Sequence, residues 1–460
     1  MNSPVSGLEH SGRPGGALTP QTLFSRESLW QSWLDVEAAL AEIQAEMGMI
    51  PDWAATQIRR AATVDQIGAD VLERHIRRTM APVMSLTRLL AEAAGEAGSY
   101  VHWGATTQNV MQTGRILLIR EADAAIRTNL ATALRLLAGL ADEHATTLMA
   151  GRTNRQHALP ITFGFKVAGW IEELGRAVQR LDGGADRLFS LPFGGAVGAF
   201  HAYGPEGQEL HRRLAERLGL RDLLVPGRAV NDLFADYVIQ LCLLAMTIER
   251  IAGEIYLLMT QEVGELAERL EEGTVGSSTM PHKINPKFVV RVLSEAAELR
   301  NMSAMALETG RTSHEGDAAA NQLLGSMLDR AVPLAWQLTE GFHVLLSRTS
   351  VDVARMERNT RLTQGGIATE NLMMKLAPRT GRAKAHDMVH HALGKPRADG
   401  ESVVEILQSD AAIADHLTRD EIRLALDPAE YCGDSERIAK EAADMARAIA
   451  DRLGLVRSGT

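Results

Sequence analysis

The chain of 460 residues has little of several features that mark particular classes of protein. Its 2 cysteines cannot form a disulfide framework or a four-sulfur metal site. Lys and Arg (48) are fewer than Asp and Glu (58), and the resulting net charge of −10 disfavours general binding to nucleic acid or to anionic lipid.

The chain also lacks the apolar segments that membrane insertion or export would need. Its most apolar stretch, Tyr237–Met246, is far shorter than the roughly 20 residues of a membrane span. The N-terminal sequence MNSPVSGLEHSGRPGG has no basic segment followed by an apolar one. We therefore expect a cytoplasmic protein that has no membrane partner.

What the sequence does contain is helical periodicity. Apolar residues recur at intervals of three and four, with strong helix formers between them, in several long segments. These segments are 33–42, 115–143, 164–181, 231–270, 287–307, 325–346 and 366–376. No region shows several β-branched runs of alternating polarity between turns, so we predict a mainly α protein without a large sheet.

The segment Asn231–Leu270 is apolar on more than one face. Leu241 and Ile248 follow the helical period, while Leu243 and Met246 make the opposite face apolar too. A helix over the whole segment would be about 60 Å long. Such a helix belongs inside a bundle, either within one large monomer or shared between subunits.

Polar breaks that contain glycine divide the chain. They fall at 95–99, 182–184, 194–198, 271–278 and 394–400. We predict a disordered lead (1–20), an N-terminal helical domain (21–113), a central domain of long helices (114–362) and a C-terminal helical domain (363–460).

The segment Gly276–Pro286, GSSTMPHKINP, has the clearest chemical character. Ser277 and Ser278 follow a glycine, prolines frame Lys283 and Asn285, and a predicted helix comes next. Backbone N–H groups at the start of that helix can bind an anion, and Lys283 adds a full charge nearby. A solvated connector has a similar composition, so both interpretations stay open at this point.

Two further segments, His102–Val110 and Gly151–Pro160, offer hydroxyls, amides and one imidazole each before a helical run. Their Thr and Asn side chains are suited to capping a helix or to binding a carboxylate. Taken alone, each histidine fits a hydrogen-bonded structural role better than a functional one. Three anion-binding segments in one chain favour a functional site.

These segments resemble the signature blocks of the fumarase/aspartase superfamily. Gly276–Pro286 matches the pattern GSSxMPxKxNP at every specified position. His102–Asn109 and Gly151–His157 are similar to the other two blocks and have the same order, and Phe193–Gly198 also resembles a family segment. Within the superfamily the chain is most similar to the branch of 3-carboxy-cis,cis-muconate cycloisomerase and adenylosuccinate lyase. The runs Leu34–Leu40, Val101–Thr106 and Gln156–Ala158 resemble the cycloisomerase in particular.

The resemblance implies an all-α, three-domain, L-aspartase-like fold. It implies a homotetramer in which long helices form a core of about 20 helices and three subunits contribute to each active site. The implied reaction is anti β-elimination, or the reverse addition, on a substituted succinate. It breaks a C–N or C–O bond and gives fumarate or an analogue, with no cofactor and no metal.

The resemblance also assigns roles to residues. Ser277 corresponds to the general base, and Lys283 and Asn285 to the groups that bind the carboxylate on which charge grows as the adjacent proton leaves. His157 corresponds to the residue that serves or orients the leaving group, and His102 is a substrate ligand and the second choice for the acid. The other implied substrate ligands are Thr106, Thr107, Gln108, Thr153, Ser278 and Met280.

The chain departs from the family pattern at several positions. Asn109 stands where an Asp is usual, and Asn154 where many members have His. Arg228–Asp232 lacks the usual Arg-Asp-Arg, and Gly316 replaces the arginine of a His-Glu-Arg segment. The loss of two guanidinium groups predicts an altered leaving-group pocket. Candidates to restore the charge are Arg155 and Arg311.

Alternatives to the lyase remain. The chain resembles 3-carboxy-cis,cis-muconate cycloisomerase, which is the second possibility. Adenylosuccinate lyases hold the phosphate of their substrate with an Arg-Tyr pair, and no such pair occurs near Phe24–Ser25, which argues against adenylosuccinate as the substrate. A catalytically retired structural protein of the same fold is the third possibility. His386 and His390 have zinc-ligand spacing but no third ligand, so we interpret them as a polar helix face.

Overall fold

A computed structural model describes residues 18–394 and 402–455 of the chain. Most of the predicted lead (1–20) and of the break at 394–400 therefore lies outside the described residues. The α-helices are α1 (Pro20–Leu23), α2 (Arg26–Glu46), α3 (Asp52–Ala61), α4 (Val64–Ile67), α5 (Ala69–Thr79), α6 (Pro82–Ala93), α7 (Thr107–Glu143), α8 (Phe163–Leu188), α9 (Gly207–Leu218), α10 (Asp232–Leu258), α11 (Phe288–Asn301), α12 (Ser303–Thr309), α13 (Ala318–Arg348), α14 (Val353–Thr360), α15 (Thr369–Thr380), α16 (Arg382–Gly394), α17 (Val403–Ser409), α18 (Ala411–Ala414), α19 (Arg419–Ala425) and α20 (Ser435–Leu455).

Short elements connect these helices. The 3-10 helices are η1 (Gly95–Tyr100), η2 (Gly204–Glu206), η3 (Arg361–Thr363), η4 (Gly366–Ala368) and η5 (Pro428–Tyr431). The strands are β1 (Leu148–Thr153), β2 (Gln156–Thr162), β3 (Leu266–Glu268) and β4 (Thr349–Val351). In the described parts of the chain they form two antiparallel pairs, β1 with β2 and β3 with β4. The prediction of an all-α fold without a large sheet is confirmed.

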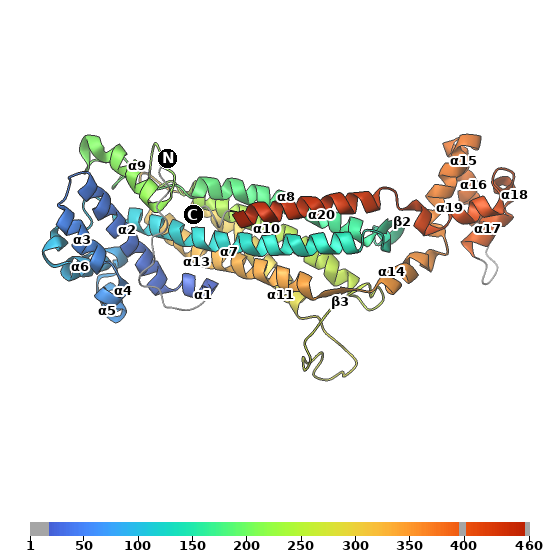
Figure 1. The fold of residues 1–460 in the computed structure, drawn as a ribbon, viewed down its shortest axis with the longest axis horizontal. Coiled ribbons are helices and arrows are strands. Elements are labelled where there is room, and N and C mark those ends of the chain that lie inside the picture. Colours follow the sequence, from blue (N-terminus) through green and yellow to red (C-terminus); the bar gives the residue numbers. More distant parts are fainter. Residues whose placement is uncertain (1–17, 395–401, 456–460) are drawn as a thin grey trace.

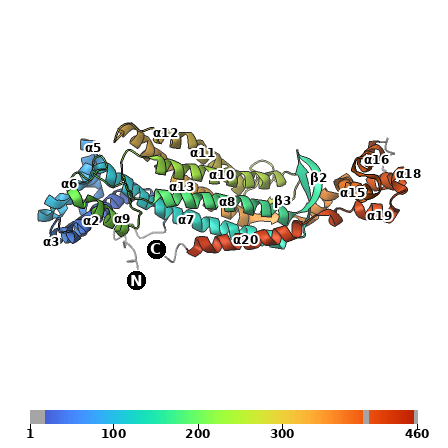
Figure 2. The same ribbon diagram turned by 90° about the horizontal axis from the view of Figure 1, so that it is seen from above.

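Long helices run side by side along the length of the molecule (Figures 1 and 2). The helix α7 has 37 residues and packs against α2, α8, α13 and α20. At 1.5 Å per residue it is about 55 Å long. It therefore spans most of the bundle and separates the segments that precede and follow it in sequence.

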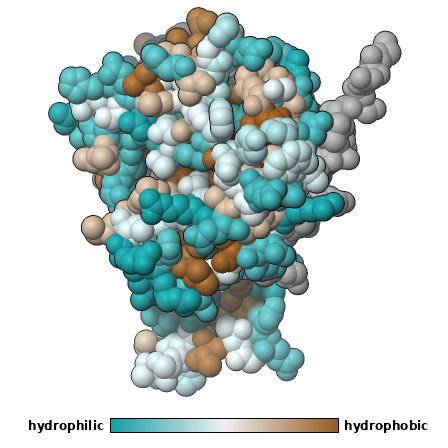
Figure 3. Space-filling model, turned by 90° about the vertical axis from the view of Figure 1, so that its left-hand side faces the viewer, coloured by the Kyte–Doolittle hydropathy of each residue, from teal (hydrophilic) through white to brown (hydrophobic). Residues whose placement is uncertain are grey.

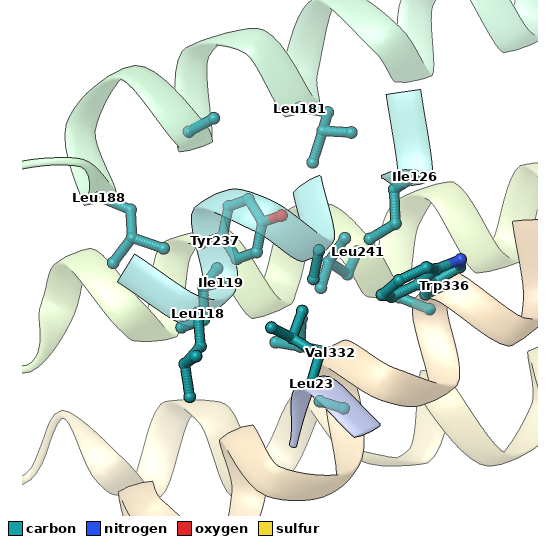
Figure 4. Packing of buried hydrophobic residues seen from close by; sticks show 14 of the residues in the cluster. Leu23, Leu118, Ile119, Ile126, Leu181, Leu188, Tyr237, Leu241, Val332 and Trp336 are labelled. Carbon is teal, nitrogen blue, oxygen red and sulfur yellow. The ribbon is translucent and has the colours of Figure 1, made fainter. Parts of the chain in front are cut away.

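The core of this bundle lies between α7, α8, α10 and α13. Tyr237 and Leu241 of α10 lie between Leu181 of α8 and Val332 of α13 (Figure 4). Tyr237 is fully buried, and its O–H donates a 2.8 Å hydrogen bond to Asp123 of α7. The buried phenol is thus paired as well as packed, as a polar group in a core must be.

The helix predicted over 231–270 is shorter than expected, because α10 ends at Leu258. After it the chain turns back, and the N–H of Glu265 donates to the carbonyl of Leu258 at 2.9 Å. Gly264 has a φ of 63°, which permits this turn. Glu265 is buried and leads into β3, which pairs with β4. The packing of this turn against distant parts of the chain, and not the local sequence pattern, therefore ends the helix.

The break predicted at 182–184 is wrong, because α8 continues through it to Leu188. Gly184 faces α10, and a Cβ atom there would lie 2.9 Å from Cγ of Gln240. Glycine at this position permits close helix packing instead of ending the helix. In contrast, the helix predicted over 287–307 is divided into α11 and α12 at Met302.

The two ends of the molecule are smaller helical clusters. The end with α3 and α6 has a mostly hydrophilic surface with smaller apolar patches (Figure 3). At the other end, α15–α19 enclose a separate core that includes Leu372, Leu376 and Ile422. The helix α20 follows this cluster in sequence but returns to pack along α7 and α8. The domain boundaries given above remain a prediction.

In the described residues, none of the helices combines the length and the apolar character needed to cross a membrane.

Candidate active site

The hairpin β1–β2 carries the segment around His157. Its strands pair Arg152 with His157 and Thr153 with Gln156, and Thr153 is exposed. The tip residues Asn154 and Arg155 both have a positive φ, of 50° and 64°. Arg155 is exposed at the tip, so its charge lies at the surface of the single chain.

A buried ion pair anchors this hairpin. Both terminal nitrogens of Arg152 donate to the carboxylate of Glu265, at 2.6 and 3.0 Å. The side chain of Glu265 is fully buried, and Asn359 of α14 donates to it as well, at 2.8 Å. Bidentate geometry and an additional donor are what a buried carboxylate requires. Strand β1, and with it the position opposite His157, is therefore fixed by groups that the sequence did not single out.

The ring of His157 is half-buried beside this ion pair. Burial, and after it the positive charge of Arg152, lowers the pKa of His157 below its ordinary value, although Glu265 acts in the opposite direction. Its Nδ1 atom is buried and has no hydrogen-bond partner among the residues described. The neutral form of His157 is therefore favoured.

His102 lies in the loop before α7 and has the opposite electrostatic environment. Its Nδ1 atom is 2.6 Å from the carboxylate of Glu37, whose side chain is almost fully buried in α2. Burial disfavours the charged imidazole, but the hydrogen bond and the charge of Glu37 outweigh this and raise the pKa of His102. A buried acid within the apolar helix Arg26–Glu46 is the signal from which this partner could have been predicted.

The residues that follow His102 begin α7. Thr106 is its N-cap residue, Thr107 its first residue, and Gln108 donates to the carbonyl of Arg228 at 2.6 Å. Gln108 therefore also positions the chain before α10. Gly104 has a φ of 76°, and a Cβ atom there would lie 2.4 Å from the ring of Tyr203, so this loop position requires glycine.

Asn109 is fully buried and has a structural role. Its Nδ2 atom donates to the carbonyl of Pro192 at 2.9 Å, and its Oδ1 atom accepts from the N–H of Gly195 at 3.0 Å. An aspartate could accept the second bond but could not donate the first. The departure from the usual Asp is thus matched to the local backbone of this chain.

The segment with Ser277 is a loop that projects from the bundle (Figure 1). Oγ of Ser277 accepts from the N–H of Met280 at 3.1 Å, and the N–H of Asn285 donates to the carbonyl of Gly276 at 3.2 Å. Ser277 and Asn285 are half-buried in the single chain. The other predicted site residues of this loop, Ser278, Met280 and Lys283, are exposed.

The N-terminus of α11 after this loop is already occupied. The carboxylate of Glu268 accepts from the N–H groups of Lys287, Phe288 and Val289, at 2.6, 3.1 and 2.8 Å. The expectation that this helix start binds an external anion is therefore wrong. An internal acid from β3 caps it.

One chain does not bring the three segments together. His102 and Thr106 lie at the N-terminal end of α7, and the hairpin with His157 follows its C-terminal end (Figures 1 and 2). The helix between them is about 55 Å long, whereas a dicarboxylate spans only a few ångströms. The loop with Ser277 projects from the bundle between these two ends.

The described residues contain no group of three or more His, Cys, Asp or Glu side chains arranged to hold a metal ion. The rings of His386 and His390 stack with centroids 5.9 Å apart on α16, and both are exposed. The described structure thus adds no third ligand to this pair.

Comparison with known proteins assigns the chain to a family. Residues 19–298 match the family model described as "Lyase", and residues 365–442 match the model "Adenylosuccinate lyase C-terminus". An adenylosuccinate lyase from Methanothermobacter thermautotrophicus is 35% identical over 437 residues, covering 92% of this chain and 95% of that protein. An N-acetyl-S-(2-succino)cysteine lyase from Dickeya dadantii is 31% identical over 447 residues, covering 97% of each.

Solved structures have the same fold. A fumarate lyase from Mesorhizobium sp. BNC1 superposes with a TM-score of 0.86 at 31% identity, covering 94% of this chain and 100% of that one. A 3-carboxy-cis,cis-muconate lactonizing enzyme from Pseudomonas putida has a TM-score of 0.85 at 30% identity, covering 95% and 97%. The chain therefore belongs to the fumarase/aspartase superfamily and is a lyase of the branch that includes adenylosuccinate lyase and 3-carboxy-cis,cis-muconate cycloisomerase.

Proposed function

We propose that this lyase catalyses anti β-elimination, or the reverse addition, on a substituted succinate, with Ser277 as the general base. It gives fumarate or a close analogue. The observation that carries the proposal is the complete segment GSSTMPHKINP on a projecting loop, in a chain that belongs to this family of lyases.

Proton removal is the difficult step. A hydrogen next to a carboxylate is weakly acidic, because its loss places a second negative charge on that group. Lys283 and Asn285 bind this carboxylate and stabilise the growing charge, while Ser277 takes the proton. Met280, Ser278 and the threonines Thr106, Thr107 and Thr153 complete the substrate site. Closure of the loop over the site excludes water and strengthens these interactions.

The active enzyme is a homotetramer in which each site takes its three segments from three subunits. The separation of His102 and His157 by the length of α7 supports this arrangement, because one chain cannot place both on the same small molecule. The projecting position of the Ser277 loop supports it as well.

The two histidines have different roles. His157, whose neutral form is favoured by burial, orients the leaving group by a hydrogen bond, or protonates it from the minor imidazolium form. His102, whose charged form is favoured by Glu37, binds a substrate carboxylate together with Gln108. Opposite environments for two titratable groups are a common way to separate such roles.

The bond that breaks is C–N or C–O in our proposal. One relative is named an adenylosuccinate lyase, and another is named a lyase of N-acetyl-S-(2-succino)cysteine, in which the succino group is attached to sulfur. The substrates to be tested should therefore include S-substituted succinates. A screen for fumarate release from N-, O- and S-substituted succinates tests the proposal. Failure of the whole series would contradict it.

The second candidate is 3-carboxy-cis,cis-muconate lactonisation, which the likeness to the lactonizing enzyme from Pseudomonas putida favours. It uses the same logic of addition and elimination. An absorbance assay with the muconate separates the two candidates. Turnover of the muconate without fumarate release from any succinate would select the cycloisomerase.

Mixing two inactive variants tests the shared site. Ser277→Ala and His157→Gln are each expected to be inactive alone. If Ser277 and His157 of one site come from different subunits, randomly mixed tetramers regain both residues in about a quarter of the sites. Activity that stays at the level of the single variants after mixing would place both residues on one subunit and contradict the proposed assembly.

A further inference from the structure

Arg228 lies in the chain between α9 and α10 and is half-buried. Its Nε atom donates a long hydrogen bond, of 3.4 Å, to the carbonyl of Glu315. Within the ranges 18–394 and 402–455, no Asp or Glu forms an ion pair with its guanidinium. Its two terminal nitrogens therefore keep their donors available for a ligand.

The backbone of Arg228 is held beside a proposed substrate ligand. Its carbonyl accepts from Gln108 at 2.6 Å and from Gln112 at 3.2 Å, both on the first turns of α7. Three residues later, the fully buried Asn231 donates to the carbonyl of Thr309 and to Asn321, at 3.1 Å each. The segment is thus fixed at Arg228 itself and again three residues after it.

Gly316 provides the space that this guanidinium occupies. A Cβ atom at position 316 would lie 2.6 Å from Nη2 and 3.0 Å from Cζ of Arg228. Gly316 is not among the glycines with a positive φ, so its backbone conformation does not require glycine. The close approach of the Arg228 guanidinium explains the glycine.

We propose that Arg228, seated over Gly316, binds a substrate carboxylate beside Gln108 and thereby determines which substrates the enzyme accepts. The inference rests on the proposed function. Asn231, in the segment where the family pattern usually reads Arg-Asp-Arg, uses its amide in buried hydrogen bonds and carries no charge. Arg311 pairs with Glu308 at 3.2 Å and is exposed, so it is the weaker candidate.

The planar guanidinium is suited to this task. Its terminal donors match the two oxygens of a carboxylate, which an ammonium group cannot do as well. The carboxylate has two possible sources: the succinate portion of the substrate, or an acidic leaving group. Fumarate contains only the first, so binding of fumarate alone separates the two sources.

The primary test is Arg228→Gln. We expect the KM for the best substrate of the screen to rise about ten- to a hundredfold, the loss expected for one charged hydrogen-bonding partner, with a smaller change in kcat. Calorimetric titration with fumarate assigns the source. Weaker fumarate binding indicates the succinate carboxylate, whereas unchanged fumarate binding with a raised KM for acidic substrates only indicates the leaving group. Arg228→Lys keeps the positive charge but lacks the two parallel N–H donors of a guanidinium. Its KM should therefore lie between those of the wild type and Arg228→Gln.

Gly316→Ala provides an independent test that keeps the charge. The new methyl group would displace the flexible end of Arg228 rather than backbone, so the fold should tolerate it. We expect it to raise KM in the same direction as Arg228→Gln. The double variant should be no worse than Arg228→Gln alone, because both changes act through one guanidinium. Additive effects would show that Gly316 acts independently.

The matched control is Arg221→Gln, which removes one charge from the same connecting segment. Arg221 is exposed and pairs with Asp186 at 3.1 Å, and we expect no change in KM. If Arg228→Gln retains the wild-type KM and fumarate affinity, the inference fails while the proposed function stands. If the wild-type protein neither binds fumarate nor turns over any succinate, the proposed function fails and the inference with it.

Discussion

The carboxylate of Glu37 lies 2.6 Å from Nδ1 of His102. Glu37 belongs to α2 and its side chain is 1% exposed, while that of His102 is 22% exposed. The contact fixes the tautomer, because Nδ1–H donates to the carboxylate and Nε2 faces away from it. A buried acid thus favours the charged form of a loop histidine at the start of α7.

Replacing this acid should change how His102 titrates. In Glu37→Gln the favourable charge is gone and burial remains, so the pKa of His102 should fall below that in the wild type. Dicarboxylate binding should then weaken at a lower pH than in the wild type. The titration of the His102 ring protons by NMR measures the shift directly. Glu42→Gln, on the same helix, is the control and should leave this titration unchanged.

The same pair has a consequence for stability. A histidine whose pKa is raised on folding stabilises the folded state fully below its ordinary pKa of about 6.5, and this contribution is lost as the pH rises through the folded value. The stability difference between wild type and Glu37→Gln should therefore shrink from pH 6 towards higher pH. A difference that grows over this range would contradict the direction of the shift.

Ser277→Ala should abolish most turnover and leave the fold intact. The hydroxyl accepts only bonds from the N–H groups of Thr279 and Met280 in the described structure, so its loss affects the loop alone. Loss of a general base lowers kcat by roughly 10²- to 10⁴-fold. An assay of fumarate release measures the turnover of the variant, and circular dichroism checks that its fold is intact. Thr274→Ala in the same loop should retain activity, and an active Ser277→Ala would remove the serine as the base.

Helix content and the loop signature could be predicted from the sequence, because both are local. The limits of α10 and α8 could not. Glu265 ends the turn after α10 by binding Arg152, more than a hundred residues away, and Gly184 continues α8 because α10 lies against it. For the same reason the capping of α11 by Glu268 could not be predicted from the sequence. Contacts between distant segments determine where these helices end and how they are capped, and the periodicity of the sequence carries no information about such contacts.

Breaking the buried pair beneath the hairpin should destabilise the protein. In Arg152→Gln the fully buried Glu265 loses both of its bonds to the guanidinium and keeps only Asn359. Removing one partner of a buried ion pair typically costs about 3–5 kcal/mol. Arg176→Gln removes an exposed pair with Glu172 and should cost less than about 1 kcal/mol. Urea unfolding of both variants measures the contrast, and equal losses would show that the hairpin pair contributes no more than a surface pair.

Restoring the usual aspartate at position 109 should be harmful in this chain. In Asn109→Asp a carboxylate oxygen would face the carbonyl of Pro192, where the amide now donates at 2.9 Å, and two acceptors would meet in a fully buried place. Leaving that carbonyl unpaired costs about 1–3 kcal/mol, and the buried charge adds to it unless the carboxyl takes up a proton. The loss should therefore be larger at pH 8 than at pH 5. Asn301→Asp, an exposed change of the same chemistry on α11, should have little effect at either pH. Full stability of Asn109→Asp at pH 8 would mean that the segment from Pro192 to Gly195 does not depend on this amide.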